Sequence, residues 1–199
     1  MAGLDIKDDS LNCEILHAAK NLFSRFGLKK TTMDDVAKAV GKGKSTLYYY
    51  YPGKTELFEA VIREEMENAV KQVRLAVNHE TEAKKKFEAY LVSRLKLRER
   101  YNNLSCVVFD EVFDNLREIL RLKKEFESTH IEFIKEIIKS GMQAGDFKKM
   151  TEEEVDFFAN WTNAAFNGLE TPSQNSLYLI ESEESCKRLA HVILSGINK

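Results

Sequence analysis

The chain has 199 residues, of which 43% are hydrophobic and 31% charged, with a net charge of −2, two prolines and nine glycines. This composition is that of an ordinary globular protein of one domain or two small ones, and the scarcity of turn residues favours long helices. The three cysteines, Cys13, Cys106 and Cys186, are widely separated and odd in number, which argues against a disulfide framework or a metal-ligand motif. Acidic residues precede the first apolar run, and no apolar stretch reaches the length of a membrane span. We therefore expect a cytoplasmic protein without a secretory signal or a membrane partner.

Three helices, of which the second and third are short, are predicted at the beginning of the chain. Apolar residues at helical spacing predict a first helix that Gly27 ends, as a C-cap would. Thr32 begins the next helix, with Asp35 three positions on in an arrangement like a capping box, and Gly41 closes it after about two turns. A third short helix is expected over about 43–50, before a Pro-Gly pair that breaks the chain.

Beyond residue 53 the apolar pattern changes to that of long helices, with no strand-period alternation and no internal repeat. The expected ranges are about 54–77, about 80–101, a long helix that ends at Gly141, 151–168 with Thr151 as its cap, and 183–197. Shorter apolar segments lie around 107–116, and residues 171–176 have the composition of a loop. The fold class predicted from this pattern is all-α.

Four consecutive tyrosines, residues 48–51, form the end of the third short helix. Buried tyrosines need partners for their hydroxyls, so a run of four rarely belongs to a core. Residues 20–54 carry eight basic and two acidic residues, a local charge of +6, so the rest of the chain sums to −8. A small basic segment on an acidic body is typical of a nucleic-acid-binding head. On charge alone, however, a solvated face is the commoner explanation.

The first two helices after Gly27 have the spacing of a helix-turn-helix, whose second helix enters the major groove of duplex DNA. That groove admits one α-helix, so polar and aromatic residues on its outer side can reach base edges. The residues expected at base edges are Lys44, Ser45, Thr46 and Tyr49, and those expected at phosphates are Thr32, Tyr48, Tyr50 and Lys54. A helical hairpin whose tyrosines cover its own body is the alternative.

This segment resembles the DNA-binding head of the TetR family of transcriptional regulators, and the match covers residues 15–58. It is carried by Phe26-Gly27, Thr32 to Ala37, Gly41, Thr46-Leu47-Tyr48, Lys54 and Leu57-Phe58. Two positions depart from the family pattern. Lys42 stands where the family commonly has an apolar residue, and Gly43 replaces its usual serine or threonine cap. The rest of the chain is similar to the family only in length and helical pattern.

The resemblance implies a helix-turn-helix DNA-binding domain over residues 10–53 and a larger helical ligand-binding and dimerisation domain over 54–199. It implies a homodimer, joined through helices 151–168 and 183–197, that binds a pseudo-palindromic operator in double-stranded DNA. It also implies a repressor that a small-molecule effector releases from the operator. Tyr51 is expected to turn inward, where the family carries phenylalanine. The residues nominated for the effector site are Phe109, Phe113, His130, Asn160 and Trp161, with Asp110 and Asn163 as further polar groups.

Two other kinds of site were considered. Glu14 with His17 and Glu127 with His130 have the spacing of di-iron helical bundles, but one pair lies in the basic head, so chance explains them better. His130 shares an apolar helix face, where a core histidine is commoner than a ligand contact. No nucleophile-base pair, phosphate loop or metal cluster is present, so we expect no enzyme activity, no cofactor and no metal. A ligand-independent DNA-binding accessory protein and a helical interaction module without DNA binding remain as alternative functions.

Overall fold

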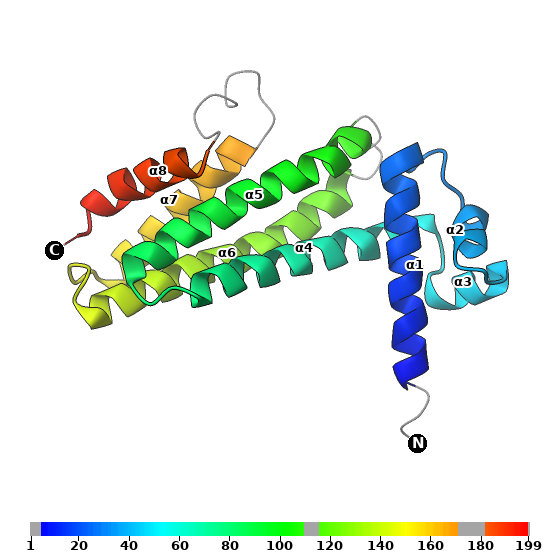
Figure 1. Ribbon diagram of the computed structural model, residues 1–199, viewed down its shortest axis with the longest axis horizontal. Helices are drawn as coiled ribbons and strands as arrows, with labels where there is room; N and C mark the ends of the chain where they lie inside the picture. The colour runs from blue at the N-terminus through cyan, green and yellow to red at the C-terminus, as the bar shows by residue number, and fades with distance from the viewer. Residues whose placement is uncertain (1–4, 110–115, 171–181, 199) are drawn as a thin grey trace. The chain divides into compact units, whose positions relative to one another are not determined.

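Eight α-helices make up almost all of the structure that is described. The computed structural model describes residues 5–109, 116–170 and 182–198 (Figure 1). The helices are α1 (Asp5–Phe26), α2 (Met33–Ala39), α3 (Lys44–Tyr50), α4 (Lys54–Asn78), α5 (Ala83–Phe109), α6 (Leu116–Ala144), α7 (Glu152–Glu170) and α8 (Glu183–Ser195). Within the described ranges, β-type pairing is limited to one isolated bridge between Phe147 and Asn198. The all-α fold class predicted from the sequence is confirmed.

The helices belong to two compact units. The first unit comprises Met1–Glu67 and Tyr101–Leu122, and the second comprises Asn68–Arg100 and Lys123–Lys199. The chain passes from one unit to the other within α4, α5 and α6. The functional division predicted at residues 10–53 and 54–199 stays a prediction. None of the described helices is long and apolar enough to cross a membrane.

The core of the first unit joins α1 and the two short helices α2 and α3 to the beginning of α4. Phe23 of α1 and Phe58 of α4 meet edge to face, with ring centroids 5.6 Å apart. Farther along α4, the buried Glu65 carboxylate pairs with the Lys20 ammonium of α1 at 2.6 Å. The other buried apolar residues of this core are Ile15, Leu16, Ala19, Leu28, Met33, Val36, Ala37, Leu47, Leu57 and Val61. α1 and α4 together therefore hold the two helices of the predicted helix-turn-helix.

Glycine turns and capping residues close in the sequence set the ends of several helices. Gly27 follows α1 with a φ of 83°, a left-handed conformation that favours glycine. Thr32 Oγ1 accepts a hydrogen bond from the Asp35 amide at 3.2 Å, and the Thr32 amide donates to Asp35 Oδ2 at 2.9 Å. This is the predicted capping box. Thr151 and Glu154 make the same reciprocal pair of bonds at the start of α7, where Thr151 was predicted as the cap.

The second unit has a larger apolar core to which α4, α5, α6, α7 and α8 contribute. Tyr90 and Phe87 on α5 and Ile134 and Ile138 on α6 are fully buried there. Further members are Val73, Val77, Ala83, Leu91, Leu95, Phe133, Ile137, Phe147, Val155, Ala159, Phe166, Cys186, Ala190, Leu194 and Ile197. The core is contiguous through all five helices, as expected for a separately packed body.

Two helix ends differ from the prediction. α5 spans Ala83–Phe109 rather than 80–101, because no glycine or proline stops it near Tyr101 and the apolar pattern alone does not mark an end. Gly141 was predicted to end the long helix, but it lies inside α6, which ends three residues later before Gly145 at a φ of 82°. A Cβ atom at Gly141 would lie 2.2 Å from the ring of Phe147, so this glycine is needed for packing.

Candidate functional site

The outer face of α3 is polar and aromatic, and the one buried residue of the helix is Leu47. Leu47 is fully buried in the core of the first unit, and it fixes which side of this short helix faces inward. Lys44, Ser45 and Tyr48 are exposed, and Tyr49 is the most open of the tyrosines, with 77% of its surface exposed. Thr46 is half buried. The Lys44 ammonium lies 5.9 Å from the centroid of the Tyr48 ring. Gly43 is the N-cap of the helix and makes no side-chain hydrogen bond there.

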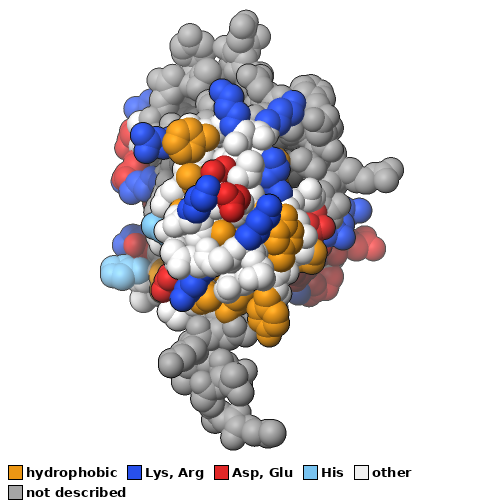
Figure 2. All heavy atoms as spheres, turned by 90° about the vertical axis from the view of Figure 1, so that its right-hand side faces the viewer, with side chains coloured by type: hydrophobic (Ala, Val, Ile, Leu, Met, Phe, Trp, Pro, Cys, Tyr) orange, Lys and Arg blue, Asp and Glu red, His pale blue; other side chains and the backbone are white. Residues whose placement is uncertain are grey.

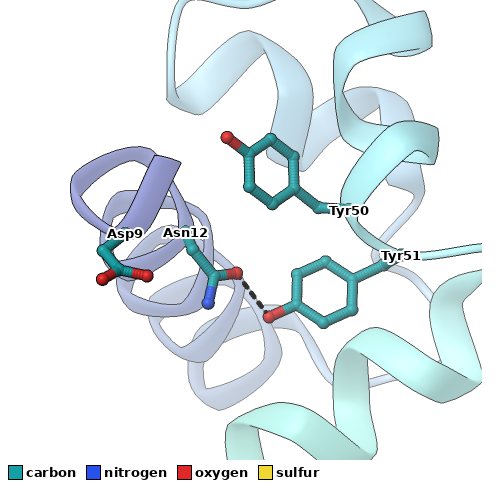
Figure 3. Close-up of a pocket in the computed structure, with 4 residues that line it drawn as sticks. All are labelled: Asp9, Asn12, Tyr50 and Tyr51. Carbon is teal, nitrogen blue, oxygen red and sulfur yellow. Dashed lines mark hydrogen bonds between the residues drawn. The ribbon is translucent and has the colours of Figure 1, made fainter. Parts of the chain in front are cut away.

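The four tyrosines divide into two pairs. Tyr48 and Tyr49 face outward, whereas Tyr50 and Tyr51 pack partly against the core of the first unit. Figure 3 shows both inner rings turned toward α1, where the Tyr51 hydroxyl donates to Asn12 Oδ1 at 2.7 Å. Partial burial raises the pKa of Tyr51, while the bond to Asn12 opposes that shift. Tyr51 thus turns inward as the resemblance implied, and phosphate contact by the half-buried Tyr50 stays a prediction.

An open cavity of about 290 Å³ lies beside the inner tyrosines, lined by Asp9, Asn12, Tyr50 and Tyr51 (Figure 3). It separates part of α1 from the end of α3. The Tyr50 ring also meets the ring of Tyr49 edge to face, with centroids 5.5 Å apart. Tyr50 therefore supports the orientation of its exposed neighbour.

Lys54, at the start of α4, is bonded within the first unit. Its ammonium donates to the carbonyl oxygens of Leu28 at 2.7 Å and Lys29 at 3.4 Å. These carbonyls lie in the turn that follows α1, where Thr31 Oγ1 also donates to the Gly27 carbonyl at 2.8 Å. The turn leads directly into Thr32, the N-cap of α2. Sequence reasoning missed this role, although unpaired carbonyls beyond a helix C-terminus do attract a lysine.

The charge of the surface around α2 and α3 depends on which lysine and aspartate side chains are already paired with each other. Lys38 is bound to Asp34 at 2.8 Å, and Asp35 is used in the capping box, where its bonds to Thr32 lower its pKa. Lys42 and Lys44, on either side of the turn before α3, are exposed. Figure 2 shows lysine and arginine side chains distributed around uncharged surface and exposed hydrophobic groups on this side of the molecule. This arrangement suits the phosphates and base edges of duplex DNA.

Of the nominated effector residues, His130, Asn160 and Trp161 have side chains that the structure describes. Phe113 lies outside the described residues, as does Asp110, and the side chain of Phe109 is not described. His130 is partly buried on α6, whereas Asn160 and Trp161 are exposed on α7. The Asn160 amide donates to the Asp156 carbonyl of its own helix at 2.8 Å. The roles of these residues in effector binding stay predictions.

A buried polar cluster around Arg94 was not predicted. This α5 residue is 5% exposed, and its Nη1 donates to the Tyr90 hydroxyl at 3.1 Å and to Asn163 Oδ1 at 3.0 Å. Its Nη2 donates to Asn167 Oδ1 at 2.9 Å, and the Asn167 amide in turn donates to Glu127 Oε1 at 3.1 Å. α5, α6 and α7 therefore meet through polar groups inside the second unit. Of its members, Asn163 was nominated from the sequence as a polar group of an effector site, and Glu127 was considered only as part of a Glu-x-x-His pair.

His130 borders this cluster. Its Nδ1 lies 3.5 Å from the Tyr90 hydroxyl, and burial together with the charge of Arg94 lowers the pKa of the imidazole to about 3. His130 is therefore neutral at physiological pH. The described residues contain no grouping of His, Cys, Asp and Glu that could hold a metal ion.

Large apolar side chains are exposed on α7 and on α8. Phe157 and Trp161 on α7 are 73% and 51% exposed, and Val192 on α8 is 66% exposed. Ala164 and Ala165 follow Trp161 at helical spacing and are also exposed. Large exposed aromatic residues in such a stripe are typical of a protein–protein interface.

Comparison with known proteins finds similarity to transcriptional regulators, over the first part of the chain for a family model and over most of the chain for individual proteins. A family model described as bacterial regulatory proteins of the tetR family matches residues 15–61. The uncharacterized HTH-type transcriptional regulator YfiR of Bacillus subtilis (strain 168) is 25% identical over 188 residues, 92% of this chain and 87% of the relative. The uncharacterized HTH-type transcriptional regulator YhgD of the same organism is 27% identical over 144 residues, 72% of this chain and 75% of the relative. A solved transcriptional regulator from Cytophaga hutchinsonii ATCC 33406 is 27% identical with a TM-score of 0.70, covering 93% of this chain and 97% of its own.

Proposed function

Because the chain belongs to the TetR family of transcriptional regulators and is a DNA-binding regulator, we propose that it is a cytoplasmic repressor released from its operator by a small-molecule effector. The observation that carries the DNA-binding part is the outer face of α3. A helix of seven residues anchored by one buried leucine leaves its lysine, serine and tyrosines available to a groove. This is the docking geometry of a recognition helix.

The proposed base contacts come from the start and outer side of α3. Lys44 suits the acceptors of guanine, and the methyl group of Thr46 suits that of thymine, with Ser45 and Tyr49 beside them. Phosphate contacts are proposed for Tyr48, Tyr50, the N-cap Thr32 and Lys54. Thr32 and Lys54 each begin a helix, where backbone amides and the helix dipole favour an anion.

Selection of bound DNA from a random pool tests this assignment. The wild-type protein is expected to select two half-sites related by a pseudo-two-fold axis, about 34–36 Å apart or a multiple of that spacing. Thr46→Ala is expected to change the preferred base at one position of each half-site, by about 1–3 kcal/mol of discrimination. Thr81→Ala, an exposed threonine after α4, serves as the control and should leave the consensus unchanged. An identical consensus for all three proteins would remove Thr46 from the base-reading set.

We propose that the homodimer required for two half-sites forms through α7 and α8. Phe157 and Trp161 supply large aromatic area, and the exposed alanines that follow allow a partner helix to approach closely. Such a stripe buried against its own symmetry mate would be removed from water on both copies.

Release by an effector requires that the ligand bind the DNA-free and DNA-bound forms with different affinity. The second unit is the proposed location of this site, and α4 links it covalently to the first unit. Titration of candidate effectors into a preformed protein–operator complex, followed by gel retardation, tests the proposal. Release of the operator is the expected result.

A further inference from the structure

The open cavity of about 290 Å³ in the first unit lies between α1 and the end of α3 (Figure 3). Asp9 and Asn12 line it from α1, and Tyr50 and Tyr51 line it from the end of α3. The Tyr51 hydroxyl donates to Asn12 Oδ1 at 2.7 Å, so the two sides of the cavity are bonded to each other. Pockets for drug-sized ligands measure about 300–1,000 Å³, so this cavity suits a small organic molecule.

The electrostatic potential at this cavity is negative. Asp9 supplies its carboxylate, and no lysine, arginine or histidine belongs to the described lining. The Asp9 side chain is exposed and has no ion-pair partner among the described residues. Burial is the largest cause of the raised pKa of Tyr51, the bond to Asn12 opposes that shift, and the negative charge of Glu64 on α4 adds to it. A second carboxylate therefore contributes negative potential at the inner tyrosine.

The uncharged groups of the lining also suit a cation. Asn12 Oδ1 accepts one hydrogen bond from Tyr51, and an amide oxygen has a second lone pair that can accept from an ammonium group. Tyrosine rings attract a cation that lies over the ring face, within about 6 Å of the centroid. A carboxylate, an amide oxygen and two aromatic rings thus surround one small cavity, and an anion there would be repelled by Asp9.

We propose that this cavity binds the ammonium group of a small organic cation, with Asp9 as the counter-ion and the rings of Tyr50 and Tyr51 as an aromatic wall. The ammonium group lies between the Asp9 carboxylate and Asn12 Oδ1, and the alkyl part packs against the rings. The site belongs to the first unit, so it is separate from the effector site proposed for the second unit. The Tyr50 ring also meets the Tyr49 ring edge to face, which places the bound cation close to a side chain proposed for base contact.

NMR titration of the full-length protein without DNA tests the class of ligand. The probes are butylammonium, tetramethylammonium, neutral 1-butanol and butanoate. At least one of the two cations is expected to bind saturably, about three- to tenfold more tightly than 1-butanol, and butanoate is expected to bind most weakly. A preference for butylammonium indicates hydrogen bonds to the carboxylate and amide oxygens, and a preference for tetramethylammonium indicates attraction to the rings. Equal binding of cation and alcohol, or no saturable binding of either cation, overturns the proposal.

The side-chain amide of Asn12 reports whether the cation enters the cavity. Its N–H resonances are expected to shift during the titration and to give the same dissociation constant as the observed binding of the ligand. The side-chain amide of Asn160 is the control, because it lies on α7 in the second unit and donates to the Asp156 carbonyl of its own helix. Its resonances should stay in place. Saturable binding that shifts Asn160 and leaves Asn12 unchanged would place the cation elsewhere and overturn this site.

Substitutions of Asp9 test the role of its charge. Asp9→Asn keeps the shape of the side chain and is expected to weaken cation binding by about two- to fivefold, a modest loss because water screens an exposed ion pair. Asp9→Lys places an ammonium group of the protein itself at the cavity and is expected to abolish binding. Asp146→Asn, an exposed carboxylate in the turn after α6, is the matched control and should bind as the wild type does. Both Asp9 variants change a surface residue and should fold, which circular dichroism checks. Wild-type affinity in Asp9→Lys, or an equal loss in Asp146→Asn, contradicts a site at Asp9.

Discussion

His130 is a residue whose titration should be measurable in the stability of the whole protein. Burial and the positive charge of Arg94 lower its folded-state pKa from 6.5 to about 3, and the Tyr90 hydroxyl lies against its ring. Between these values the unfolded chain binds a proton that the folded chain does not. The free energy of unfolding is therefore unaffected by the titration of His130 above pH 6.5, and it decreases progressively as the pH falls from 6.5 toward 3. From pH 8 to pH 5 we expect a loss of about 2 kcal/mol.

Urea unfolding at these two pH values, at one protein concentration, measures the effect. His130→Gln should remove the additional loss, whereas the exposed His79→Gln should retain it. Other groups that titrate in this range contribute equally to all three proteins and cancel in the comparison. A wild type and a His130→Gln variant that lose the same stability between pH 8 and pH 5 would show that His130 is not held neutral.

Lys54 combines two roles that one substitution can separate. Two donors of its ammonium hold the carbonyls of Leu28 and Lys29, and a lysine has a third donor that remains for a phosphate. Lys54→Met keeps the aliphatic stem but leaves the turn before α2 without this support. We expect a loss of about 1–2 kcal/mol in unfolding free energy, weaker operator binding, and a salt slope of log K that is shallower by about one.

Fluorescence anisotropy of labelled operator at several salt concentrations gives the slope, and chemical unfolding gives the stability. Lys84→Met, on the exposed surface of α5, is the control and should change neither quantity. Lower stability with an unchanged slope would restrict Lys54 to holding the turn. An unchanged stability would contradict the structural role instead.

At the level of elements, the turn after α6 depends on the absence of a side chain at Gly141. A Cβ atom there would lie 2.2 Å from Phe147 and 2.8 Å from Ala83, so the ring of Phe147 has to move. Gly141→Ala is expected to destabilise the protein by about 1–3 kcal/mol, although alanine is the better helix former. Thermal unfolding of Gly141→Ala, Phe147→Leu and the double variant measures the coupling, and the double variant should lose less than the sum. Strict additivity would show that the two residues do not clash.

The sequence predicts those elements whose signals are local. Thr32 and Thr151 mark helix starts because each caps its helix through a residue three positions on. Gly141 gives a wrong helix end because the sequence alone does not distinguish a glycine that makes room for a packed ring from one that ends a helix. The α3 face was predictable because its residues and its buried Leu47 lie within seven consecutive residues of one helix. The Arg94 cluster was not, because its partners lie on α7, some seventy residues away.

For the whole molecule, the exposed stripe on α7 has more than one interpretation in the sequence. Trp161 was nominated for the effector site because aromatic residues line small-molecule pockets. In the structure its ring is half exposed and lies one helical turn from the still more exposed Phe157. This exposed pair supports the dimer interface proposed for α7, and the role of Trp161 in an effector site stays a prediction.

The last prediction joins this stripe to DNA binding. Trp161→Glu places a charge in the proposed dimer interface, where desolvation without a partner is costly, but leaves the protomer core unchanged. We expect a monomer by size-exclusion chromatography with light scattering, and a large loss of operator affinity, because one head no longer raises the effective concentration of the other. Leu75→Glu is the matched control, since Leu75 on α4 is 69% exposed and lies outside the stripe. It should remain a dimer with wild-type affinity. If Trp161→Glu remains a dimer, the dimer interface does not lie at this stripe. If the variant is a monomer that binds the operator normally, one DNA-binding head is sufficient for operator binding.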